Sequence, residues 1–166
     1  MEQSRPTYSS QLPPPASPRR VAGMMLGTLG TLVLAAAFGI SGPHPLHYAA
    51  RLGSPTLVRA LAGIYDADAT TRSGSTALHF AAREGHAEVA RVLVDAGADL
   101  DGKGRGGQSA LYWAARGGHV DVVRVLVEAG ADVDAETQYG STPLRAAHSR
   151  NHREVVELLV QAGARQ

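Results

Sequence analysis

The sequence contains no cysteine and no strong excess of charge of either sign. Without cysteine, disulfide bonds, thiolate metal sites and cysteine nucleophiles are excluded. Sixteen Lys and Arg residues face fifteen Asp and Glu residues, which gives a formal net charge of +1. A general nucleic-acid binder normally shows a large basic excess. We therefore predict no nucleic-acid partner.

A phrase of thirteen residues returns along the chain at a nearly fixed distance. It occurs at 74–86, 107–119 and 140–152, and the copies are 33 residues apart. A weaker copy at 42–53 begins 32 residues before the first. A period of this size indicates one supersecondary unit per copy, which must stack on its neighbours to bury its apolar face.

Each of the three clear copies carries the signals of two consecutive helices. A hydroxyl residue stands where the first helix begins, and a residue that tolerates left-handed backbone follows that helix: Thr76 with Gly85, Ser109 with Gly118, and Thr142 with Asn151. A second stretch places apolar residues on one helical face, as in 89–94. The segments 99–107 and 132–140 are rich in turn residues and predict hairpin-like connections.

These motifs resemble the ankyrin repeat, whose pattern runs G-x-T-P-L-H-x-A-A-x-x-G-H-x-x-V-V-x-x-L-L-x-x-G-A-D. The resemblance covers Gly42 to the C-terminus and implies an all-α solenoid of stacked helix–turn–helix units. We expect four repeats within 41–166, at about 41–70, 71–103, 104–136 and 137–166. The first is degenerate, because it is one residue short and has His44 in place of the helix-starting Thr. The last carries extra polar residues and is predicted to be a polar cap.

The N-terminal region has a different composition. Residues 1–20 are rich in Ser and Pro and are predicted to be disordered. Residues 21–40 carry no charge over a length that spans a hydrocarbon core as a single hydrophobic helix. We expect a single-pass membrane protein anchored by this helix. A secretory signal peptide cleaved near Ala37, giving a secreted or periplasmic product, and a buried helix covering the first repeat are the alternatives.

The resemblance implies a non-enzymatic protein–protein interaction module. Neither a cofactor nor a small-molecule substrate is expected. The glycine-rich run 102–107 lacks the strand and helix that a dinucleotide-binding loop requires. Histidines recurring once per repeat lie too far apart to converge on one metal. An exported or structural subunit of a membrane or envelope complex is the alternative function.

In this family, partners are usually contacted by hairpin tips and by residues near the end of each first helix. The corresponding tip residues are Arg72, Ser73, Ser75, Arg105, Gln108, Gln138 and Tyr139, and the helix-end residues are Arg51, Arg83, Glu84, Arg116 and Arg150.

Three of these helix-end arginines, Arg51, Arg83 and Arg116, stand at equivalent positions and predict a ladder that suits an acidic partner. A solvated face, with Glu84 screening Arg83, is the alternative.

Two further expectations concern residues outside that set. Phe80 and Trp113 stand where the family usually has Leu, and they are expected in the core. On the second helices, Arg91 precedes Asp95 by four residues and Arg124 precedes Glu128 by four, which predicts local ion pairs.

Carbonate extraction tests the predicted membrane anchor. Membranes from cells that express the full chain should retain the protein in the pellet, because a helix over 21–40 would be held by the hydrocarbon core. Release of a soluble product that begins at Phe38 would establish the signal-peptide alternative.

Overall fold

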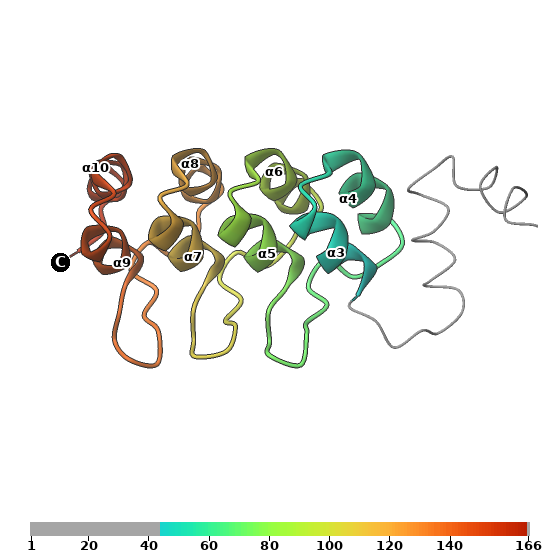
Figure 1. Cartoon of the computed structure of the whole chain (residues 1–166), viewed down its shortest axis with the longest axis horizontal. Coiled ribbons are helices and arrows are strands. Elements are labelled where there is room, and N and C mark those ends of the chain that lie inside the picture. The colour runs from blue at the N-terminus through green and yellow to red at the C-terminus, as the bar shows by residue number, and fades with distance from the viewer. Residues whose placement is uncertain (1–43, 166) are drawn as a thin grey trace, which may run out of the picture. The chain divides into compact units, whose positions relative to one another are not determined.

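The structure is a computed structural model that describes residues 44–165, and within this span it is entirely helical (Figure 1). Eight helices follow one another as pairs: α3 (Pro45–Arg51) with α4 (Pro55–Ala62), α5 (Ala77–Glu84) with α6 (Ala87–Asp95), α7 (Ala110–Gly117) with α8 (Val120–Glu128), and α9 (Pro143–Ser149) with α10 (Arg153–Gln161). No strand occurs between residues 44 and 165. The predicted all-α solenoid is therefore confirmed, whereas the hydrophobic helix expected over 21–40 lies outside the described residues.

The helix pairs stack into two layers. Helices α3, α5, α7 and α9 pack side by side in one layer, and α4, α6, α8 and α10 pack in the other (Figure 1). The two members of each pair also contact each other. Each repeat thus packs only against its own partner helix and the adjacent repeats, as a solenoid requires.

The predicted start and stop signals act as expected. Ser109 Oγ accepts a hydrogen bond from the Tyr112 backbone N–H at 3.2 Å, and Thr142 Oγ1 accepts from Arg145 N–H at the same distance. Both bonds satisfy a helix N–H that has no intrahelical partner. The residues that follow the first helices are left-handed, including Asn151 with φ of 59°. Local chemistry therefore fixes the length of each first helix.

The core is built from leucine, valine and alanine repeated in register. Leu78 and Leu111 are fully buried, and Leu144 is nearly so. Ala114 and Ala115 are fully buried, and their small side chains allow the neighbouring first helices to approach closely. On α8, Val122 is also fully buried.

The first repeat is degenerate at its start and at its end, as predicted. His44 occupies the N-cap of α3 but makes no side-chain capping bond. Helix α4 ends at Gly63 in right-handed conformation, and Tyr65 N–H bonds Leu61 C=O at 2.8 Å. At the corresponding end of α6 the chain uses left-handed Gly97. The missing residue therefore falls in the exit turn of α4.

The connections between repeats are tight turns that project from the first-helix layer (Figure 1). In each turn a backbone N–H bonds the carbonyl four residues later: Thr71 to Ser75, Gly104 to Gln108, and Thr137 to Ser141, at 2.9 to 3.0 Å. The second and third turns are linked because Gln138 N–H donates to Gly106 C=O at 3.0 Å. A Cβ at Gly107 would lie only 2.8 Å from Gln138 N, so this close approach requires glycine.

No helix within residues 44–165 combines the length and hydrophobicity needed to cross a membrane. The segment 21–40, on which the membrane prediction depends, lies outside these residues.

Replacing Leu111 by Ala should destabilise the array by about 2–5 kcal/mol, because a large-to-small change at a fully buried site leaves a cavity. Urea denaturation followed by circular dichroism measures the change. Arg124→Ala on the exposed side of α8 is the control and should stay within about 0.5 kcal/mol. A loss at Leu111 as small as that of the control would contradict its place in the core.

Candidate protein-binding surface

The three arginines of the predicted ladder stand at equivalent positions near the ends of α3, α5 and α7. The backbone carbonyl of each arginine accepts a hydrogen bond from a histidine of the following repeat: Arg51 from His86 at 3.2 Å, Arg83 from His119 at 3.0 Å, and Arg116 from His152 at 3.1 Å. A carbonyl can only accept, so Nε2 carries the proton in each histidine. Each arginine backbone is thus fixed by the repeat that stacks on it.

This histidine contact depends on a glycine at the end of the first helix. A Cβ built at Gly85 would lie 2.6 Å from His119 Nδ1, and one at Gly118 would lie 2.6 Å from His152 Nδ1. Both glycines also have φ above 70°. A side chain there would displace the imidazole and strain the backbone at once.

Phe80 and Trp113 were expected in the core, and the structure places them at its edge. Both rings are only half-buried. The Arg83 guanidinium carbon lies 5.6 Å from the centre of the Phe80 ring, and that of Arg116 lies 5.3 Å from the Trp113 ring. These are cation–π distances. The interior of the layer is filled by fully buried alanines such as Ala81, so the large rings lie at its surface.

Tyr48 completes the series of aromatic residues, and sequence reasoning missed it. It stands at the position equivalent to Phe80 and Trp113, and 45% of its surface is exposed. The missed signal is the spacing, because an aromatic residue precedes an arginine by three positions in all three repeats. Residues three apart are neighbours on a helix surface. We call the set Tyr48, Phe80, Trp113, Arg51, Arg83 and Arg116 the arginine–aromatic row.

The central arginine differs from the other two in its charge environment. Arg83 Nη2 lies 2.9 Å from Glu84 Oε1, with 46% and 38% of the two side chains exposed. Arg51 and Arg116 form no ion pair with any residue in 44–165. The sequence left two alternatives open, a ladder of available arginines and a solvated face screened by Glu84. The screened alternative describes Arg83, and Arg51 and Arg116 are not screened.

The other predicted contact residues lie in the turns between repeats or just after α9. The turn residues Arg72, Ser73, Arg105 and Gln138 are exposed, Tyr139 is 81% exposed, and Ser75 and Gln108 are half-buried. Arg150 is exposed just after α9. The turns and the helix ends thus form two separate sets, and α9 adds no aromatic residue because Ala146 occupies that position.

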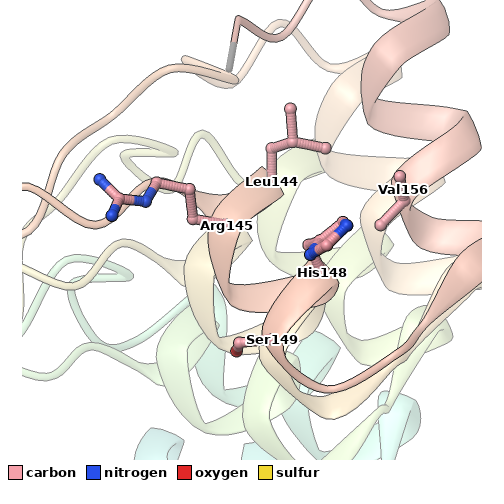
Figure 2. A pocket seen from close by; sticks show the side chains of 5 residues that line it. All are labelled: Leu144, Arg145, His148, Ser149 and Val156. Carbon is pink, nitrogen blue, oxygen red and sulfur yellow. The ribbon is translucent and has the colours of Figure 1, made fainter.

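The last repeat leaves an open pocket of about 370 Å³ lined by Leu144, Arg145, His148, Ser149 and Val156 (Figure 2). In Figure 2, Arg145 extends away from the other lining side chains. His148 and Val156 correspond to Ala115 and Val123, which the fourth repeat covers completely. The pocket is therefore the stacking face of this repeat. The predicted polar cap is only partly formed, because Val160 is also 51% exposed.

Two other histidines are buried within the stack. His47 Nε2 donates to Ala69 C=O at 2.7 Å, and His79 Nε2 donates to Gln108 C=O at 3.1 Å. His79 Nδ1 accepts from the Thr76 backbone N–H at 3.1 Å, so this imidazole is neutral. Burial lowers the pKa of both His47 and His79 below the usual value of 6.5.

The motifs that were weighed as possible sites of chemistry are parts of the repeat structure within residues 44–165. The glycine-rich run 102–107 lies in the turn between α6 and α7. Within residues 44–165 no three potential ligands cluster around a common point that could hold a metal ion. The ion pairs expected from Arg91 and Arg124 with the acidic residues four positions on are not formed, and the only two pairs in this span are Arg83–Glu84 and Arg165–Asp134.

Stacked helix pairs joined by projecting turns define a repeat-protein solenoid. A comparison with protein families identifies its kind: the model described as ankyrin repeats, in three copies, matches residues 29–104 and 100–166. The chain belongs to the ankyrin-repeat family, whose repeats indicate a protein–protein interaction module. A search of curated proteins found no match to the chain.

Stability should fall as the pH drops below about 6.5, because the unfolded chain then binds protons that folded His47 and His79 do not. Above this pH both histidines are neutral in the folded and in the unfolded chain, so their contribution to stability no longer changes with pH. The decline is at most about 1.4 kcal/mol per pH unit for each histidine. Thermal melts between pH 7.5 and 5 measure it. The double variant His47→Asn, His79→Asn should show a shallower dependence on pH, and an unchanged slope would assign the effect elsewhere.

Proposed function

We propose that this chain is a non-enzymatic ankyrin-repeat module that binds an acidic protein partner on its arginine–aromatic row. The observation that carries this proposal is the repeated pairing of an arginine with an aromatic residue three positions before it on successive first helices, with cation–π distances at Phe80 and Trp113. Aromatic residues and arginine are the side chains most enriched at the centres of protein interfaces.

The rigidity of the row supports a binding role. The row lies on packed helices, and the backbone of each of its arginines is held by a histidine of the next repeat. The guanidinium groups of Arg83 and Arg116 are further ordered over aromatic rings. A surface that is already ordered loses less conformational freedom when a partner binds.

The charge of the row supports an acidic partner. Arg51 and Arg116 have no carboxylate within ion-pair distance in residues 44–165. Arginine binds carboxylates through two parallel hydrogen bonds, a geometry that lysine does not offer. Carboxylates of a partner would therefore supply what this surface lacks.

The histidines support a non-enzymatic role. The five that recur in the stack, His47, His79, His86, His119 and His152, each bond a backbone carbonyl through Nε2. The same kind of bond in every repeat indicates that these imidazoles serve in stacking.

We also propose that residues 21–40 place this module at a membrane. The support is the uncharged run of twenty residues, which is long enough to span a hydrocarbon core as a helix. Carbonate extraction, as described above, is the test.

Selection of binders from a random peptide display library tests the binding surface with the full chain as target. The triple variant Arg51→Ala, Arg83→Ala, Arg116→Ala should bind the selected peptides at least about tenfold more weakly, a loss typical of interface hot spots. Its melting temperature should hardly change, because Arg51 and Arg83 are exposed and Arg116 is only half-buried.

The matched control is Arg91→Ala with Arg124→Ala, which removes exposed arginines from the second helices. This variant should bind the selected peptides nearly as well as the natural chain. Equal losses from both variants would show nonspecific charge attraction, and no loss from the triple variant would contradict the proposed surface.

A further inference from the structure

The spacing of the arginines restricts the conformation of a peptide that could contact all three. Neighbouring packed helices lie about 8–10 Å apart, so Arg51, Arg83 and Arg116 recur at about that interval. A polyproline II helix rises about 3.1 Å per residue with three residues per turn, so every third side chain faces the same way at about 9.3 Å. In a β-strand the third side chain faces the opposite side, because the period is two.

The aromatic residues of the row fit the same conformation. Tyr48 is exposed, and Phe80 and Trp113 are half-buried one repeat apart beside the arginines. Grooves lined with aromatic side chains bind polyproline II segments, whose rigid backbone loses little entropy on binding. Prolines between the acidic residues would therefore pack on the rings while the carboxylates meet the arginines.

At the central position, Glu84 competes with a partner's carboxylate for Arg83. Glu84 lies 2.9 Å from Arg83. The equivalent residues in the neighbouring repeats are Leu52 and Gly117, which carry no charge. Intramolecular competition thus acts at the middle arginine, and Arg51 and Arg116 remain open to the ligand.

We propose, on the basis of the function proposed above, that the partner segment is an acidic polyproline II stretch with carboxylates at positions i, i+3 and i+6, and that Glu84 weakens its central contact. The chain's own N-terminal segment does not fit, because its proline-rich residues 1–20 contain a single acidic residue, Glu2. The occupant that we propose is a segment of another protein.

Binding of synthetic peptides to the full chain in non-ionic detergent, followed by fluorescence anisotropy, tests the spacing. A peptide with Glu-Pro-Pro repeats and three glutamates should bind at least about fivefold more tightly than one of equal composition with adjacent glutamates. Its binding should weaken between 50 and 300 mM salt, because the Debye length shortens over this range. Equal affinity for the two peptides, or tighter binding of an oligouridine of similar charge, would overturn the proposal.

The Glu84→Gln variant tests the competition. It should bind the spaced peptide roughly two- to fivefold more tightly, the range that corresponds to an exposed ion pair. A gain in affinity cannot arise from misfolding. Glu128→Gln on α8 is the matched control, since it removes the same charge from a residue without an ion pair and should leave the affinity nearly unchanged.

The outcomes separate this inference from the proposed function. If display-selected peptides depend on the arginine–aromatic row but show no acidic residue at every third position, the binding surface stands and the inference is wrong. If Glu84→Gln has no more effect than Glu128→Gln, the competition is wrong. If the selected peptides do not depend on the row, both proposals fail.

Discussion

The hydrogen bond from a histidine of one repeat to the end of the preceding first helix is the contact on which the rest of the surface depends. His119 donates to Arg83 C=O, and it can do so only because Gly85 leaves room for its ring. The same bond recurs at His86 and His152. This stacking contact therefore also fixes the backbone position of each arginine. Stability and the proposed recognition share these atoms, so damage to stacking would also move the residues of the arginine–aromatic row.

Much of the fold could be predicted because its signals are local and repeat. Ser109 and Thr142 cap their helices through their own side chains, and Asn151 ends α9 in left-handed conformation. The missing residue of the first repeat was likewise visible as a broken period. None of these inferences required knowledge of contacts between distant residues.

The candidate surface was harder to predict because it depends on which side of a helix meets its neighbour. Phe80 was expected in the core because the family usually has Leu at its position, but the alanines already fill that space, and its ring lies near His47 and Arg83. The pairing of Arg83 with Glu84 was left open by sequence. Arg91 and Asp95 have favourable spacing but no ion pair, as exposed pairs gain little free energy.

The stacking interval also limits how long a ligand the array could follow. A rigid peptide and a row of helices differ in pitch by up to about 1.3 Å per repeat. Over three arginines the error accumulates to no more than about 2.6 Å, which long and flexible side chains absorb. Over many repeats this difference would accumulate until the peptide side chains no longer faced the arginines. The aromatic residues end with Trp113, and Ala146 and Ser149 occupy the next positions. Because the row has only three aromatic–arginine pairs, a straight peptide can match its spacing along the whole row.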